Sequence, residues 1–441
     1  MRSALLLTMC AGMFLVQLDV TVVNVALPAI GTDLHGGLAA LQWVVDGYTV
    51  VLAAFLLTGG ALGDVFGHRR VVLAGFALFG GASAACGLAG AAPWLVAARA
   101  GQGLGAALLL PGTLAVITNA YPGRAERARA LGIWAGVSAL ALAAGPVLGG
   151  AVVAAAGWRP VFWLNVPVVL AAAWATRRLV PRGERAPGRR VDFAGVATAA
   201  PALGAGVYAV IAGSVAAGIL AVVALAGFLA VEHRSPDPML PPDVVRPTLA
   251  ANFVAVAMNF TGIGAILVLT LYLQGVRHAS PLTAGLEVLP LFGPLSLLAP
   301  VAGRLTGRFG PRPPMVAGLA LGALGMLNMV LLNGTSGYAA LLPTLLGLGI
   351  GMGLLTTAVV TAAVGGIPPE RAGVAGGVNN TARQAGGALG VAVLGAIVGE
   401  PARPGEFLAG LHVAGVVAAA LWLVALGVTV TAVRTRDSVS P

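Results

Sequence analysis

This 441-residue chain contains very few charged residues. Charged residues make up 9% of the chain, hydrophobic residues make up 58%, and the mean hydropathy is +0.95. A soluble domain carries about 25% charged residues. So few charges cannot give a globule of this size a polar surface. The composition therefore excludes a soluble fold and indicates a protein whose solvent is lipid.

Cysteine and histidine are too few and too scattered for the chemistry that they usually support. The two cysteines, Cys10 and Cys86, both lie in apolar runs, which argues against a disulfide framework. The five histidines are dispersed and have no metal-ligand spacing. No nucleophile stands in a pattern with a base. We therefore expect no metal, no cofactor and no enzymatic activity.

Long apolar segments are abundant. A helix that spans a membrane needs about 20 apolar residues, and fourteen segments approach or exceed this length, each bounded by Gly, Pro or charge. They lie at 4–30, 41–63, 71–90, 93–118, 130–154, 160–176, 193–211, 214–231, 249–273, 282–302, 314–332, 338–363, 372–398 and 407–433. The sequence therefore predicts an all-α membrane protein with 14 transmembrane helices.

The placement of arginine supports this count. Lysine is absent, so all 25 basic residues are arginine. With a cytoplasmic N-terminus, twenty arginines fall in cytoplasmic segments, only Arg159, Arg277 and Arg403 fall in outer loops, and the remaining two lie within spans. This is the distribution that the positive-inside rule requires, and it places both termini in the cytoplasm. The arginines are scattered along the chain as signals of membrane orientation, without aromatic residues between them. This pattern excludes nucleic acid as a partner. Arginine without lysine, together with 64 glycines, suggests a bacterium with a GC-rich genome.

The chain divides around two polar connectors and contains an internal repeat. The connectors, 177–192 and 232–248, flank an uncharged helix pair at 193–231, which we expect at the lipid-facing periphery. The segment from Gly60 to Arg69 matches the segment from Gly303 to Arg312 in the glycines at its first and eighth positions, its leucine, its phenylalanine and its last arginine. We predict an N-terminal six-helix bundle at 1–180, a linker with two extra helices at 181–248, and a C-terminal six-helix bundle at 249–441. Duplicated half-bundles are typical of carriers that work by alternating access.

The first copy of the repeat carries a family resemblance. It resembles the signature loop between the second and third spans of the major facilitator superfamily, although Val65 and His68 stand where that pattern prefers basic residues. The resemblance implies a gating loop whose charges pair when the inner face closes. Its residues would be Gly60, Asp64, Gly67, Arg69 and Arg70.

Further segments resemble the fourteen-helix drug/proton antiporters of that superfamily, and they do so in order along nearly the whole chain. They are 18–28, 99–107, 145–150, 158–167, 272–274, 280–286 and 373–390. The resemblance implies a major-facilitator fold and associates Gly145, Pro146, Gly149 and Gly150 with the antiporter motif of the fifth span. Ala141 departs from the motif, where an upstream glycine is typical. Alternatively, Gly145, Pro146, Gly149 and Gly150 only bend the helix and allow it to pack closely on its neighbours.

Ionisable residues within apolar spans are the strongest functional candidates. At mid-bilayer each costs at least about 2.5–3.5 kcal/mol on insertion scales, so it needs a reason to be there. We assign proton coupling to Asp19, Arg99, Asp46 and Glu287. Buried ion pairs that only fix helix registry remain the alternative.

Uncharged polar residues and one arginine in the spans are candidates for a substrate cavity. They are Gln17, Thr21, Asn24, Gln102, Asn380, Arg383 and Gln384. On the first span, Gln17, Thr21 and Asn24 share a stripe from which Asp19 points away. The sequence leaves open which of these faces lines the cavity and which packs on neighbouring helices.

Together these features predict a proton-coupled antiporter. It would export a small amphipathic compound, whether a drug, an antibiotic or a self-made metabolite, across the bacterial cytoplasmic membrane by alternating access. A buried carboxylate is poorly solvated when charged, so it can take up a proton outside and release it inside. The partners would be a small-molecule substrate, protons and membrane lipid, with the chain acting as a monomer and no cofactor beyond the proton gradient. Uptake or facilitated transport of a small nutrient is the alternative.

Overall fold

The computed structural model describes residues 2–121, 123–181, 193–235, 238, 240–365, 367 and 372–433. Every regular element in these ranges is a helix. Thirteen of the helices are long and apolar enough to cross a membrane. The predicted all-α membrane fold is therefore confirmed, and these thirteen helices plus one broken span correspond to the fourteen predicted segments.

The chain forms two compact units, Met1–Met239 and Leu240–Pro441. This division groups the extra helix pair with the first unit. The helices of the first unit are α1 (Arg2–Asp33), α2 (Leu38–Phe66), α3 (His68–Gly87), α4 (Ala92–Ala120), α5 (Arg124–Ala156), α6 (Arg159–Trp163), α7 (Asn165–Leu179), α8 (Phe193–Ala212) and α9 (Val215–Arg234).

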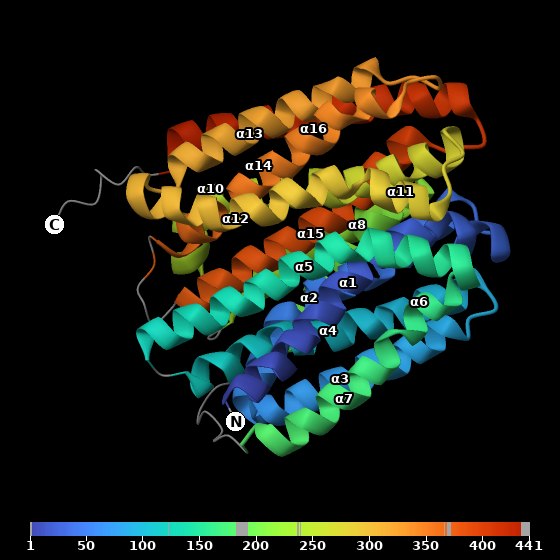
Figure 1. Cartoon of the computed structure of the whole chain (residues 1–441). Coiled ribbons are helices and arrows are strands. Elements are labelled where there is room, and N and C mark those ends of the chain that lie inside the picture. Colours follow the sequence, from blue (N-terminus) through green and yellow to red (C-terminus); the bar gives the residue numbers. More distant parts are fainter. Residues whose placement is uncertain are drawn as a thin grey trace. The chain divides into compact units, whose positions relative to one another are not determined.

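The second unit begins with a helix that starts earlier than the predicted residue 249. Its elements are α10 (Pro242–Leu271), the π-helix η1 (Tyr272–Val276), α11 (Pro281–Glu287), α12 (Leu289–Phe309), α13 (Arg312–Leu327), the 3-10 helix η2 (Asn328–Leu331), α14 (Tyr338–Val364), α15 (Ala372–Val398) and α16 (Pro404–Ala432). Figure 1 shows that the long helices of each unit run roughly parallel or antiparallel to one another.

The sixth predicted span, 160–176, is broken in the structure. Helix α6 ends at Trp163 and α7 begins at Asn165, with the intervening Leu164 still in helical conformation. Pro167 explains the break, because it has no N–H to donate to the carbonyl of Trp163 four residues earlier. The break allows a new helix to begin at Asn165, a residue that proves important below.

The helix pair α8 and α9, which carries no charged residue before Glu232, packs as a hairpin, and α8 also lies along α2. Only 17% of the residues in the most apolar stretch of α8 are buried, and only 11% of those in the most apolar stretch of α9. The ring of Tyr208 on α8 stands 6.1 Å from that of Trp43 on α2, measured between centroids. Low burial of two apolar helices is typical of helices that face lipid in a membrane protein, and the lipid-facing position of this pair stays a prediction.

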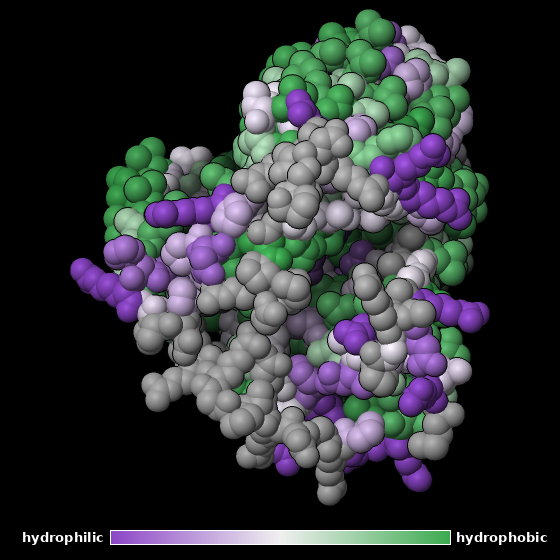
Figure 2. Space-filling model, turned by 90° about the vertical axis from the view of Figure 1, so that its left-hand side faces the viewer, coloured by the Kyte–Doolittle hydropathy of each residue, from purple (hydrophilic) through white to green (hydrophobic). Residues whose placement is uncertain are grey.

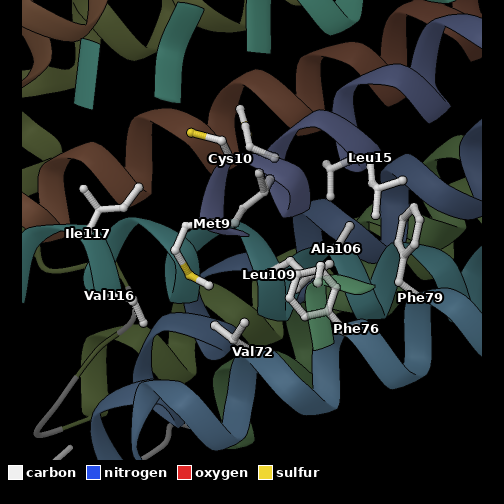
Figure 3. Packing of buried hydrophobic residues seen from close by; sticks show 14 of the residues in the cluster. Met9, Cys10, Leu15, Val72, Phe76, Phe79, Ala106, Leu109, Val116 and Ile117 are labelled. Carbon is white, nitrogen blue, oxygen red and sulfur yellow. The ribbon is translucent and has the colours of Figure 1, made fainter. Parts of the chain in front are cut away.

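A large apolar core holds α1, α3 and α4 together. Figure 3 shows Met9 of α1, Phe76 of α3 and Leu109 of α4 pointing toward one another. All three side chains are fully buried. This core fixes the spacing of the three helices that carry most of the polar site described below.

Viewed onto one end of the helices, hydrophilic residues gather at that end and hydrophobic residues surround the sides (Figure 2).

The two copies of the internal repeat adopt the same local conformation. Each ends a helix at a phenylalanine and passes through a glycine with positive φ, which is 90° at Gly67 and 83° at Gly310. The next helix begins at His68 in the first copy and at Arg312 in the second. Glycine occupies the turn because it reaches positive φ without a Cβ clash.

Candidate functional site

Asp19 and Arg99, both predicted as functional charges, form a buried ion pair. Asp19 lies on α1 and Arg99 on α4, and each side chain is only 1% exposed. Nη1 of Arg99 donates to Oδ2 of Asp19. The structure thus brings together two charges that stand 80 residues apart in the sequence.

The guanidinium of Arg99 has further partners. Its Nε donates to the carbonyl oxygen of Val44 at 2.8 Å, and its Nη1 also donates to Oε1 of Gln102 at 2.9 Å. Its Cζ lies 4.5 Å from the ring centroid of Tyr48, within the range of a cation–π contact. Arg99 is therefore anchored to α2 and to its own helix as well as to Asp19.

The second carboxylate oxygen of Asp19 accepts from two amides. Nε2 of Gln102 lies 3.2 Å from Oδ1, and Nδ2 of Asn165 lies 3.3 Å from it. The same two nitrogens reach Oγ of Ser83, at 2.8 and 3.3 Å. The thiol of Cys86 donates to Oε1 of Gln102 at 3.2 Å. We call Asp19, Ser83, Cys86, Arg99, Gln102 and Asn165 the polar cluster.

The polar cluster matches a charged carboxylate. Arg99 is a donor only, so the amide of Gln102 must turn Oε1 toward it and Nε2 toward Asp19. Each described partner of Asp19 therefore donates, and a protonated Asp19 would carry an O–H with none of these groups facing it as an acceptor. The hydroxyl of Ser83 already receives two donors and donates to the carbonyl of Phe79. Among the described residues, the polar cluster therefore offers Asp19 donors and no acceptor.

Sequence reasoning found only part of this cluster. It placed Gln102 in the substrate cavity, whereas the side chain is fully buried against Asp19 and Arg99. It missed Ser83, Cys86 and Asn165. Spacing gave one usable signal, because Gln102 lies three residues after Arg99 and therefore on the same helix face.

The polar stripe on α1 packs against α5. Thr21 is 1% exposed and Asn24 fully buried, while Gln17 remains partly exposed. A Cβ on Gly145 would overlap the hydroxyl of Thr21, and a Cβ on Gly149 would come within 3.0 Å of a carbonyl oxygen of α1. Gly145 and Gly149 of the predicted antiporter motif thus allow α5 to pack closely against α1, and Pro146 and Gly150 are also buried. Thr21 and Asn24, which we expected to line the cavity, are packed in this structure.

The other two candidates for proton coupling lie outside the polar cluster. Asp46 on α2 is fully buried, and its Oδ1 accepts from the hydroxyl of Thr49 at 3.1 Å. Its Oδ2 has no hydrogen-bond partner in the structure. Glu287, the last residue of α11, pairs with Arg277 at 3.1 Å and is 16% exposed.

The predicted gating loop joins α2 to α3. Nη2 of Arg69 donates to the carbonyl oxygen of Arg177 at 2.6 Å, which satisfies an acceptor in the last turn of α7. Gly60 is partly buried, Gly67 buried and Arg70 exposed. The side chain of Asp64, and with it the predicted charge pairing, lies outside the described residues.

The polar candidates of the second unit lie on α15. Asn380, Arg383 and Gln384 are all partly buried. Nδ2 of the neighbouring Asn379 donates to Oδ1 of Asn252 on α10 at 3.0 Å. Within the described ranges, no group of three or more His, Cys, Asp or Glu residues could hold a metal ion.

The arrangement can be compared with known proteins. A family model described as Major Facilitator Superfamily matches residues 9–391. The tetracenomycin C resistance and export protein of Streptomyces glaucescens is 39% identical over 89% of this chain and 75% of its own length. The multidrug resistance protein Stp of Mycobacterium tuberculosis is 38% identical over 90% of this chain and 76% of its own length.

Solved structures agree in fold. A crystal structure of the peptide transporter POT in complex with sulfate has a TM-score of 0.71 at 20% identity, covering 97% of this chain and 95% of that one. A bacterial homologue of the human lysosomal transporter Spinster, in an inward-facing and unoccupied conformation, has a TM-score of 0.70 at 20% identity. That match covers 98% of this chain and 97% of the homologue.

Proposed function

Because the chain belongs to the Major Facilitator Superfamily, we propose that it exports a small amphipathic compound from a bacterial cell in exchange for protons. The direction and the class of cargo are supported by relatives named for resistance and export, such as those for tetracenomycin C and methylenomycin A. The cargo is a drug, an antibiotic or a metabolite made by the host itself. The transport cycle is alternating access between the two six-helix bundles predicted above, 1–180 and 249–441.

The observation that carries proton coupling is the buried ion pair of Asp19 with Arg99. Asp19 takes up a proton when its site is open to the outside. The neutral acid then releases Arg99, because the polar cluster offers donors and a protonated carboxyl needs an acceptor. Arg99 stays charged throughout, since a guanidinium is not deprotonated in proteins. Its return to Asp19 expels the proton toward the inside.

The energy source is the inward proton gradient. Its electrical part is worth about 2.3 kcal/mol per charge per 100 mV. The chain needs no other cofactor in this scheme and works as a monomer with both termini in the cytoplasm. The twenty arginines assigned to the cytoplasmic side support this orientation.

The test is proton release from purified protein in weakly buffered detergent solution when an exported compound is added. Wild-type protein should release protons, and Asp19→Asn should still bind the compound but release none. Glu406→Gln is the matched control, because Glu406 is 73% exposed and its ion pair among the described residues is with Arg403 just before α16. Unchanged release from Asp19→Asn would place the proton site elsewhere, with Asp46 next to test. Substrate counterflow in proteoliposomes separates export from nutrient uptake.

A further inference from the structure

Arg383 is a cationic side chain inside a membrane span of the second unit. It lies on α15, eleven residues after that helix begins at Ala372. At 1.5 Å per residue this is about 16 Å from the helix end, close to mid-membrane depth. The side chain is partly buried. A charge at this depth is costly and needs a counter-charge or a polar partner.

No such partner faces Arg383 in the part of the chain that the structure describes. Its Nε is buried without a hydrogen-bond acceptor, and no ion pair or hydrogen bond joins its guanidinium to another described residue. The case contrasts with Arg99, which has a carboxylate, a carbonyl and an amide oxygen around it.

The described acids of the second unit do not lie where they could pair with Arg383. Glu287 and Glu406 already pair with Arg277 and Arg403. Asp243 lies in the first turn of α10. Glu400 follows α15 and is 17 residues from Arg383, about 26 Å along the helix. Among the described residues of this unit, no carboxylate remains for Arg383.

The backbone around Arg383 packs closely against α10, which lies beside α15 (Figure 1). On one side Asn379 bonds to Asn252, and on the other a Cβ on Gly386 would run into the backbone of Val256. The guanidinium thus projects from a fixed position. Asn380 lies three residues earlier on the same face of α15 and is also only partly buried, so it offers an amide donor there.

We propose that Arg383 binds an anionic oxygen of the exported compound, which makes the cargo an amphipathic acid. A carboxylate or an acidic phenol or enol supplies the missing counter-charge, and the guanidinium fork suits a carboxylate in particular. The inference rests on the export function proposed above and narrows its substrate class.

The test is a susceptibility panel in a bacterial host that lacks its own efflux pumps. The panel contains the acids fusidic acid and novobiocin, the neutral chloramphenicol and the cationic ethidium. Wild-type protein should protect against at least one acid. Arg383→Gln should weaken that protection about tenfold or more, as expected for loss of a charge-assisted hydrogen bond, and should spare protection against any neutral compound. Arg383→Lys keeps the charge and should retain part of the protection.

The control is Arg403→Gln, the same substitution at a side chain that is 69% exposed, and it should leave all protection unchanged. Membrane abundance and gel-filtration profiles establish that each variant folds. Protection limited to neutral or cationic compounds would overturn the inference. Equal loss of protection against all classes in Arg383→Gln would also overturn it, because Arg383 would then serve transport in general. Protection against no compound of any charge would refute the export function itself.

Discussion

The buried ion pair between Asp19 and Arg99 should make a large contribution to the free energy of unfolding of the protein. Asp19→Asn keeps the shape of the side chain and removes its charge, so Arg99 stays buried without its counter-ion. Breaking a buried pair in this way costs about 3–5 kcal/mol. Arg99 keeps two oxygen acceptors, the carbonyl of Val44 and Oε1 of Gln102, and the ring of Tyr48. We therefore expect the lower end of this range, about 3 kcal/mol.

Arg99→Gln should cost a similar amount, because it leaves Asp19 charged with only the two amide donors of Gln102 and Asn165. In the double variant no charge is left without a partner. The double variant should therefore be less destabilised than the sum of the two single variants, by about 3 kcal/mol.

The assay is equilibrium unfolding in detergent, followed by tryptophan fluorescence, for all four members of this double-mutant cycle. The matched control is the cycle of Asp33→Asn with Arg159→Gln. This pair joins the same residue types at 2.7 Å, and Asp33 also lies on α1, but its side chains are 41–45% exposed. Its coupling energy should stay below about 1 kcal/mol. A buried pair that couples no more strongly than the exposed one would refute the reasoning.

Two further predictions concern packing and topology. Gly145→Ala should destabilise the protein by about 1–3 kcal/mol through overpacking, because the added methyl overlaps Thr21. The control is Gly136→Ala on the same helix, whose added methyl meets nothing within 4 Å. It should be neutral or slightly stabilising in the same unfolding assay. Equal effects of the two substitutions would show that α1 and α5 do not pack closely. Reporter fusions at Pro187 and at the C-terminus should report the cytoplasm and a fusion at Gly36 the exterior, and an external C-terminus would contradict the fourteen-helix topology.

The sequence could predict the class of fold because lipid imposes simple rules. Apolar length alone identified the spans, and all fourteen predicted segments have helical counterparts. The break between α6 and α7 was missed, since an apolar run hides a proline-induced change in hydrogen bonding. The signal was present at Pro167, which stands within the predicted sixth span.

The candidate site was predictable only where charge marked it. Asp19 and Arg99 stood out because an ionisable residue in an apolar run is rare. Ser83 and Asn165 could not be identified in this way, because small uncharged polar residues are common in packed helices and one sequence shows no contacts between spans. The same limit applied to Thr21, whose burial depends on a glycine more than 120 residues later.

The thiol of Cys86 makes the polar cluster a site that thiol-specific reagents can label directly. Cys86 is fully buried and donates to Gln102, while the chain's other cysteine, Cys10, lies in the apolar core with 2% exposure. The native protein thus presents no accessible thiol to maleimides or methanethiosulfonates while the cluster is closed. A Cys10→Ser background leaves one intrinsic reporter whose alkylation rate measures how often the helices around Asp19 separate, without any introduced label site.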